Sequence, residues 1–200
     1  MKTPQFIQSS YLSQEAVNEC CDLYEKYQNL VEPGKILSGV NASVKDSQDL
    51  SMPPENFCKE SQVYISELHQ SIRDYVETYP MLNEKMDKWG IVDEVLIQYY
   101  KPGGGYKVEH FERSGLGTSH RLLVYMTYLT NTPNAGTHFP LQNWTSSCEK
   151  GLTLIWPADW MYTHVGVINE KKDKMIITGW TGFLDEWGSP IGNNWTGFQT

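Results

Sequence analysis

The spacing of apolar residues changes near Gly90 from the period of a helix to the period of a strand, and this change limits the fold most strongly. Before Gly90, apolar side chains recur three and four positions apart after Ser13 and again over residues 57–76, which predicts two amphipathic helices. After Gly90, apolar side chains alternate over residues 95–100 and 122–129, which predicts strands. Because no helical pattern separates these strands, a parallel α/β fold is excluded.

The predicted fold class is mainly β with flanking helices (α+β), and its core is an antiparallel sandwich or barrel. Further short strands are expected at residues 152–156 and 174–180, whereas the turn-rich residues 33–54 are expected to form a loop. A chain of 200 residues is long enough for a single domain with its own core. We expect residues 1–90 to form a helical support region, packed on the outer face of one sheet, and residues 91–200 to form the β core.

Acidic residues outnumber basic ones by 24 to 16, which gives a net charge of −8 and an isoelectric point of about 5.1. This balance argues against sequence-independent binding to nucleic acid or to an anionic membrane. The sequence has neither a signal-peptide pattern nor a run of 18 apolar residues, so we expect a cytoplasmic protein without a membrane span. Its four cysteines lack the spacing of a zinc site and are expected to be reduced.

Three side chains from distant segments form a candidate metal site. His110 and Glu112 stand two residues apart after a glycine-rich turn, and the period of a strand places both on one face. Such a pair alone is a weak signal, because strands supply it by chance. His164 follows an aromatic segment, at residues 156–162, and completes a set of two imidazoles and one carboxylate. This set is typical of Fe(II) sites that keep adjacent coordination positions open.

His110, Glu112, His164, Lys174 and Trp180, in this order and spacing, resemble the signature of the 2-oxoglutarate/Fe(II) oxygenases of the prolyl 4-hydroxylase-like branch. The similarity extends over roughly the second half of the chain. Bacteriophage-encoded relatives have a similar Trp-Pro-Ala-x-Trp segment, which would place such a protein in a host cytoplasm. The resemblance implies a double-stranded β-helix (jelly-roll) core, in which the two histidines and the glutamate bind iron.

Two features depart from the pattern of that branch. Glu112 stands where most members have aspartate, and its extra methylene group lengthens the reach of the ligand. Residues 135–140 resemble the family's Gly-Gly-x-Thr-x-Phe-Pro turn, but Ala135 replaces the first glycine and His138 stands at a position that is usually polar. His138 is therefore a rival metal ligand, although its place in the turn favours a position behind the ligands or on the surface.

Lys174 is a candidate for binding the co-substrate. If residues 174–180 form a strand, Lys174 shares a face with Ile176, Thr178 and Trp180. A lysine on an apolar face needs an anionic partner, because an isolated buried charge loses its hydration. The C5 carboxylate of 2-oxoglutarate would meet this need. The alternative is a lysine whose ammonium group reaches solvent at the start of the strand.

The resemblance also implies roles for neighbouring side chains. Tyr100 and Tyr128 match tyrosines that line the family's co-substrate pocket, and Thr178 and Trp180 match positions beside His164. The alternative for these residues is a purely structural one, because aromatic side chains on inward strand faces usually fill the core.

The implied activity is that of a dioxygenase that uses Fe(II), 2-oxoglutarate and O2, with ascorbate as a further candidate, to hydroxylate an unactivated C–H bond. The expected substrate is proline in a peptide or protein, as for a procollagen-proline 4-dioxygenase. A free amino acid or another small molecule is the first alternative. A metal-free jelly-roll module that binds peptide or carbohydrate is the second, although it would not need Lys174 or the three converging ligands.

Overall fold

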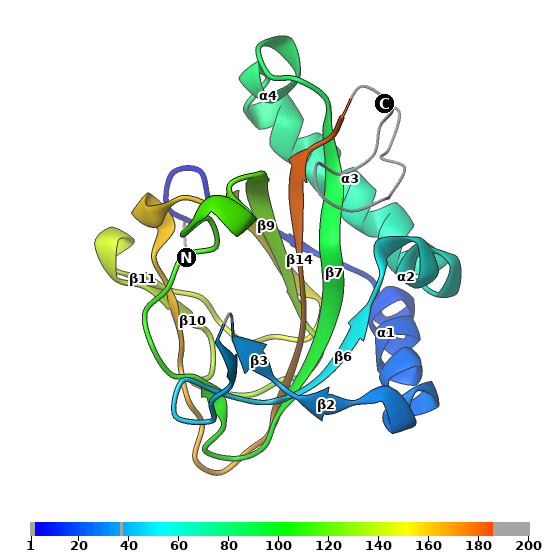
Figure 1. The fold of residues 1–200 in the computed structure, drawn as a ribbon, viewed down its shortest axis with the longest axis vertical. Helices are drawn as coiled ribbons and strands as arrows, with labels where there is room; N and C mark the ends of the chain where they lie inside the picture. The colour runs from blue at the N-terminus through cyan, green and yellow to red at the C-terminus, as the bar shows by residue number, and fades with distance from the viewer. Residues whose placement is uncertain (1–2, 37, 186–200) are drawn as a thin grey trace.

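The computed structural model describes residues 3–36 and 38–185 of the chain (Figure 1). Its α-helices are α1 (Gln14–Lys26), α2 (Pro54–Glu60), α3 (Gln62–Thr78) and α4 (Met81–Glu84). Its strands are β1 (Gln8–Tyr11), β2 (Glu32–Pro33), β3 (Lys35–Ile36), β4 (Gly39–Val40), β5 (Lys45–Asp46), β6 (Gln48–Met52), β7 (Trp89–Tyr100), β8 (Gly105–Tyr106), β9 (Arg121–Tyr128), β10 (Thr137–Phe139), β11 (Trp144–Thr145), β12 (Leu152–Pro157), β13 (Val165–Gly166) and β14 (Lys174–Phe183). Short 3-10 helices are η1 (Gln28–Leu30), η2 (Leu116–Thr118), η3 (Pro140–Gln142) and η4 (Trp160–Tyr162).

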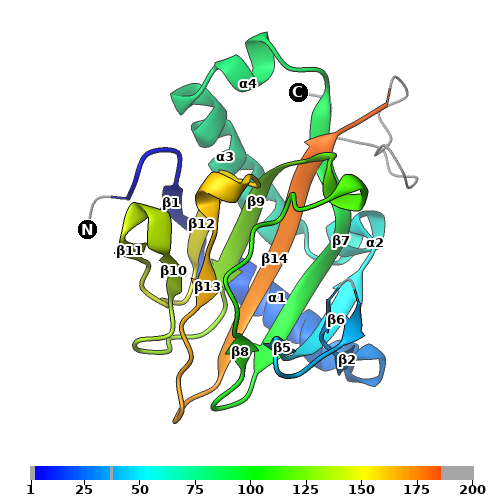
Figure 2. The same ribbon diagram turned by 60° about the vertical axis from the view of Figure 1, so that its left-hand side comes forward.

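The largest sheet within the described residues has seven strands in the order β1-β12-β9-β14-β7-β6-β2, and all its pairs are antiparallel. β14 lies at its centre, between β9 and β7. A smaller sheet, β11-β10-β13, and the strand pair β5-β8 lie across from it (Figure 2). These two layers confirm the expected double-stranded β-helix (jelly-roll) core.

The large sheet separates two hydrophobic cores, because alternate side chains of a strand point to opposite faces. On one face, Met175 and Ile177 of β14 pack with apolar residues of α1 and α3. On the other face, Ile176 and Trp180 pack with Phe139 of the smaller sheet. Figure 1 shows α1 and α3 on the same side of the large sheet. The helices therefore cover one outer face, as the sequence predicts.

α1 begins where the sequence predicts, because the hydroxyl of Ser13 accepts the N–H of Ala16 at 3.1 Å. The carboxylate of Glu67 in α3 accepts two further hydrogen bonds from Ser13 and so joins the two helices. The prediction of one helix over residues 57–76 is wrong, since α2 and α3 are separate and meet at Ser61. Ser61 has a non-helical φ of −134°, and its hydroxyl donates to the Phe57 carbonyl at 2.6 Å.

The prediction that residues 33–54 form a loop is also wrong. β6 lies in this stretch and pairs with β7 along its whole length, and β2 extends the sheet beyond β6. β1 lies at the opposite edge, beside β12. Because these three strands belong to the large sheet, residues 1–90 are more than a helical support for residues 91–200. Within the second range, residues 186–200 lie outside the described residues.

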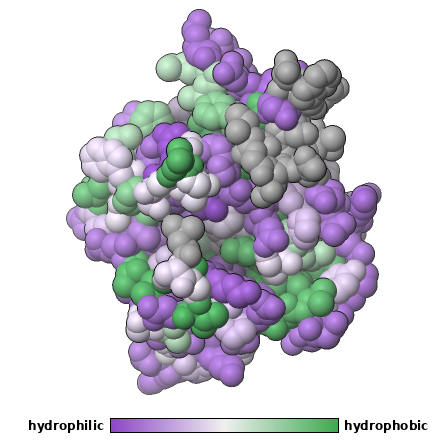
Figure 3. All heavy atoms as spheres, in the orientation of Figure 1, coloured by the Kyte–Doolittle hydropathy of each residue, from purple (hydrophilic) through white to green (hydrophobic). Residues whose placement is uncertain are grey.

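The face drawn in Figure 3 carries hydrophilic and hydrophobic residues in separate patches. Among the exposed large apolar side chains are Leu116 of η2 and Trp160 of η4, which belong to segments that adjoin the site below. No helix of the described residues has the length and apolar character needed to cross a membrane.

Candidate active site

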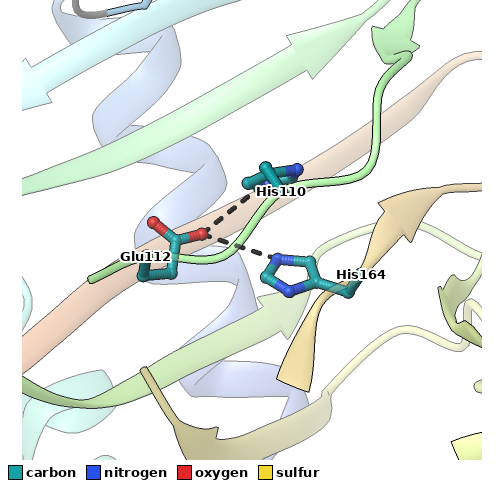
Figure 4. A group of neighbouring side chains, drawn as sticks. All are labelled: His110, Glu112 and His164. Carbon is teal, nitrogen blue, oxygen red and sulfur yellow. Dashed lines mark ion pairs between the residues drawn. The ribbon is translucent and has the colours of Figure 1, made fainter. Parts of the chain in front are cut away.

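His110 and His164 lie side by side because their backbones pair. The N–H of His110 donates to the carbonyl of His164 at 3.0 Å, and the N–H of His164 donates back at 2.8 Å. This isolated bridge stands in place of the longer strand predicted around His110. The carboxylate of Glu112 points toward both rings (Figure 4). One potential ligand atom from each of the three residues lies within 4.8 Å of the other two, so the predicted group does converge.

Hydrogen bonds behind the rings orient both imidazoles. Nδ1 of His110 lies 3.1 Å from the Val108 carbonyl, and Nδ1 of His164 lies 2.9 Å from the Tyr162 carbonyl. Since a carbonyl only accepts, each Nδ1 carries a proton, and a neutral ring turns the lone pair of Nε2 toward Glu112. The two Nε2 atoms lie 3.4 and 3.5 Å from Oε1 of Glu112. Such electron-rich atoms repel one another unless a proton or a metal cation lies among them, so the donor set fits a divalent metal.

The second carboxylate oxygen of Glu112 is held from the other side. The indole N–H of Trp180 donates to Oε2 at 3.0 Å, and Nη1 of Arg121 donates to it at 3.3 Å. Burial raises the pKa of Glu112, but the hydrogen bonds and charges that His110 and His164 supply when their rings are protonated outweigh burial and hold this pKa well below its usual range. The carboxylate is therefore ionised at neutral pH.

The converging side chains open into a cavity of about 730 Å³. All the site residues predicted from the sequence line this one cavity: Tyr100, His110, Glu112, Tyr128, His164, Lys174, Thr178 and Trp180. The face shared by Lys174, Ile176, Thr178 and Trp180 of β14 forms part of its wall, as the period of the strand predicts. Their individual roles stay predictions.

Lys174 is buried within this cavity, and among the described residues its ammonium group forms hydrogen bonds only with backbone carbonyls. Its Nζ donates to the carbonyls of Ala135 at 3.1 Å and Val167 at 3.2 Å, and lies 5.3 Å from the ring centroid of Tyr100. In the described part of the chain, no carboxylate lies within ion-pair distance of Lys174. Burial lowers the pKa of Lys174 to about 8. The alternative in which its ammonium group reaches solvent does not hold, since 6% of the residue is exposed.

No protein-family model matches the chain, and neither does any curated protein. Similar solved structures include the viral collagen prolyl hydroxylase of Paramecium Bursaria Chlorella virus-1 in complex with 2OG. It is 18% identical, with a TM-score of 0.66 over 90% of this chain and 97% of that one. The prolyl-4-hydroxylase of Pseudomonas putida is 13% identical, with a TM-score of 0.66 over 89% and 92% of the two chains. A Trichoplax adhaerens prolyl hydroxylase, in complex with a hypoxia inducible factor oxygen degradation domain peptide fragment, is 15% identical, with a TM-score of 0.67 over 94% and 88%.

The chain has the fold of the prolyl hydroxylases. The resemblance inferred from the sequence is thereby confirmed at the level of the fold. It also extends further than the sequence motifs do, because the match to the viral enzyme includes 90% of this chain.

In this prolyl hydroxylase fold, two predicted tyrosines line the cavity and have partners for their hydroxyl groups. The hydroxyl of Tyr128 lies 2.8 Å from Oγ1 of Thr137 and 2.7 Å from Oγ of Ser146. The hydroxyl of Tyr100 donates to Oε1 of Gln98 at 2.9 Å. Burial raises the pKa of both tyrosines, so both hydroxyls keep their protons and remain hydrogen-bond donors.

His138 lies on the outward side of β10, since the residues on either side of it, Thr137 and Phe139, are buried. Its Nδ1 lies 2.8 Å from Oγ1 of Thr145 on the neighbouring strand. The structure does not bring it into the group of potential ligands. The expectation that His138 lies away from the ligands agrees with this placement.

The sequence did not reveal the side chains that pack against the ligands. Tyr106 stacks on the ring of His110, with centroids 3.7 Å apart, and Trp156 meets the ring of His164 edge-on at 5.1 Å. Arg121 contacts Glu112 from the start of β9, a strand whose other residues are all buried. A charged residue at the start of an otherwise apolar strand is the sequence signal that points to Arg121.

Proposed function

We propose that the protein is a 2-oxoglutarate- and Fe(II)-dependent dioxygenase of the prolyl 4-hydroxylase type. One observation carries the proposal: the Nε2 atoms of two orientated imidazoles and one carboxylate oxygen converge in the same cavity as a buried lysine without an acidic partner among the described residues. A metal-free binding module has no need of either feature. The neighbours of the same fold, one of them in complex with 2OG, support the proposal.

In this proposal, His110, Glu112 and His164 hold the metal. Fe(II) bound there would supply the oxidation of a C–H bond by O2, coupled to decarboxylation of 2-oxoglutarate to succinate. The role of the protein's own residues is to bind the metal and the co-substrate and to orient them. Lys174 attracts the distal carboxylate of the co-substrate, and the hydroxyl of Tyr128 lies on the wall of the same cavity as a hydrogen-bond donor.

The expected substrate is a proline residue in a peptide or protein. The Trichoplax neighbour is a complex with a peptide fragment, which supports a peptide substrate. The segments that flank the cavity also expose apolar side chains, with Trp160 62% and Met161 48% exposed between Trp156 and His164. Exposed aromatic and methionine side chains are frequent in peptide contacts. A free amino acid as substrate is the alternative that the experiment below distinguishes.

The first experiment is an anaerobic titration of metal-stripped protein with Fe(II) and 2-oxoglutarate, with the visible charge-transfer band of the chelate as the readout. We expect the band in the wild type and its loss in His164→Ala. His138→Ala is the matched control, because His138 lies outside the ligand group. A wild type without the band would refute the proposed function, and a wild-type band in His164→Ala would refute the ligand assignment.

The substrate class requires a second experiment. Proline-containing peptides and free proline are each incubated aerobically with the iron-loaded protein, and mass spectrometry detects the gain of one oxygen atom. We expect oxidised peptide together with succinate. Oxidation of free proline alone would favour the small-molecule alternative.

A further inference from the structure

Glu112 has one methylene group more than the aspartate usual in the prolyl 4-hydroxylase-like pattern, and its carboxylate has two unlike surroundings. Oε1 faces the imidazoles of His110 and His164. Oε2 accepts hydrogen bonds from Trp180 and Arg121. A longer carboxylate has more freedom to rotate and to chelate a metal through both oxygens, so the contacts of Oε2 determine how this residue can act.

Arg121 is fixed on three sides. Its Nε donates to Oδ2 of Asp93 at 2.7 Å, and Nη1 also donates to the backbone carbonyl of Glu112 at 3.3 Å. Its guanidinium carbon lies 3.8 Å from the ring centroid of Trp180, as in a cation–π contact. The other oxygen of Asp93 lies 2.9 Å from Nε2 of His120. These contacts hold the plane of the guanidinium in one orientation beside the carboxylate.

A β-bulge places Asp93 where it meets Arg121. On β14, Thr178 and Trp180 pair with Leu96 and Val92 of β7, so three residues of β7 stand opposite one residue of β14. Asp93 lies in this bulge with a φ of +58°, in the left-handed region, which non-glycine residues seldom adopt although aspartate does so more often than most. Such a conformation costs about 1–3 kcal/mol and persists only where surrounding contacts determine it.

We propose that Arg121 and Trp180 are positioning residues that hold Oε2 of Glu112 away from the metal, so that this glutamate is a ligand through Oε1 alone. A single ligand oxygen leaves free the coordination position that a chelating carboxylate would occupy, and the co-substrate needs that position. Asp93 does not contact the Glu112 carboxylate itself in the described structure, but it accepts a hydrogen bond from Arg121 and so fixes the orientation of that side chain. The inference rests on the proposed function and explains how a glutamate can serve at a position where aspartate is usual.

The test uses Mn²⁺ as the probe on full-length protein, with the variants Arg121→Met and Trp180→Phe. Trp180→Phe keeps an aromatic ring beside Arg121 and removes the N–H donor together with part of the indole ring system. We expect each variant to weaken Mn²⁺ binding about 10- to 100-fold, measured by the electron paramagnetic resonance signal of free Mn²⁺. We also expect weaker water proton relaxation by bound Mn²⁺, because a chelating Glu112 displaces an exchangeable water.

Arg113→Met is the matched control. Arg113 follows Glu112 directly, but its guanidinium pairs with Asp159 at 2.5 Å and makes no contact with the Glu112 carboxylate in the described structure. We expect its Mn²⁺ affinity and relaxation to equal those of the wild type. An equal loss in Arg113→Met and Arg121→Met would refute the inference, because it would show a general effect of charge.

A double-mutant cycle with Glu112→Asp separates positioning from folding. We expect the shorter aspartate to lose its contact with the two donors when it binds the metal, so Arg121→Met should cost little further affinity in that background. Additive losses would refute the inference, as would wild-type affinity and relaxation in both Arg121→Met and Trp180→Phe. A wild type that binds no Mn²⁺ would instead refute the proposed function, so the two failures are distinguishable.

Discussion

Within the described residues, the buried ammonium group of Lys174 forms hydrogen bonds with carbonyl oxygens alone, so no neighbouring carboxylate there neutralises its charge. Removing an ammonium group from water is costly, and the lowered pKa of Lys174 reflects that cost. A ligand that brings a carboxylate into the cavity would restore the missing counter-charge. The protonation of Lys174 and the binding of a dicarboxylate are therefore coupled.

This coupling predicts how the affinity for 2-oxoglutarate depends on pH. In the free protein Lys174 loses its proton as the pH rises through about 8, whereas a bound carboxylate favours the protonated form and raises this pKa. Binding above pH 8 must therefore take up a proton, and the affinity should fall by up to about tenfold per pH unit. Calorimetric titration of the Mn²⁺-loaded protein between about pH 7 and pH 9.5 measures this effect.

Lys174→Arg is the control for that titration. A guanidinium stays protonated over this range, so the variant should show a flat profile even if it binds more weakly. A wild-type affinity that does not change up to about pH 9.5 would contradict the assignment of Lys174 to the co-substrate.

At the residue scale, the sequence was informative where the chemistry is local and uninformative where the backbone departs from regularity. His110, Glu112 and His164 could be predicted because their order and spacing along the chain resemble a known family pattern, although the pair His110 and Glu112 alone is a weak signal. Lys174 could be predicted because a lysine on an apolar strand face needs an anionic partner. Arg121 could not, because strict alternation from Tyr128 along β9 places it on the opposite face. The register of β9 against β14 shifts at this end, and the arginine side chain lines the cavity instead.

At the scale of elements, the approach of β10 to the segment before β12 depends on Gly136. A Cβ atom at Gly136 would lie 1.9 Å from the backbone carbonyl oxygen of Ser146, which leaves no room for a side chain. We expect Gly136→Ala to lower the free energy of unfolding by about 1–3 kcal/mol, because the two segments must separate. Urea denaturation measures this loss.

Gly117→Ala is the matched control, since a Cβ atom at Gly117 meets nothing within 4 Å. Its free energy of unfolding should equal that of the wild type within the error of the measurement. If Gly136→Ala were as stable as Gly117→Ala, the close packing described for this turn would be wrong.

The long elements were predictable because their patterns are long. The start of α1 and the alternation in β7, β9 and β14 follow directly from the residues. β6 was missed because its sequence, Gln-Asp-Leu-Ser-Met, has only two apolar residues and lies among prolines and glycines. β6 forms because its backbone pairs with the edge of β7. This pairing depends on the tertiary structure, so the local sequence does not predict it.

At the scale of the whole molecule, the first ninety residues supply both edges of the large sheet. β1 covers β12, while β6 and β2 cover β7. A fragment of residues 91–200 would therefore expose two strand edges and an apolar face that α1 and α3 normally cover. We expect this fragment to show no cooperative thermal unfolding by near-ultraviolet circular dichroism, whereas the full chain does. A cooperative transition in the fragment would show that residues 91–200 fold without residues 1–90.

Metal binding should stabilise the whole fold, because the ligands come from segments that converge only in the folded chain. A ligand at 100 times its Kd that binds only the folded state adds about 2.7 kcal/mol to the free energy of unfolding. We expect Mn²⁺ to raise the Tm of the wild type and to leave that of Glu112→Ala unchanged, as measured by differential scanning calorimetry. An equal rise in both proteins would place the bound metal elsewhere.

The pairing of β1 with β12 joins Gln8 to Ile155 across most of the chain. The residues of β1 are synthesised well before those of β12, so during translation they leave the ribosome before their pairing partner exists. Contacts between such distant parts of a chain form slowly. The nascent protein therefore passes through a period in which an unpaired strand is open to capture by other chains, and chaperones that shield such segments would act during that period.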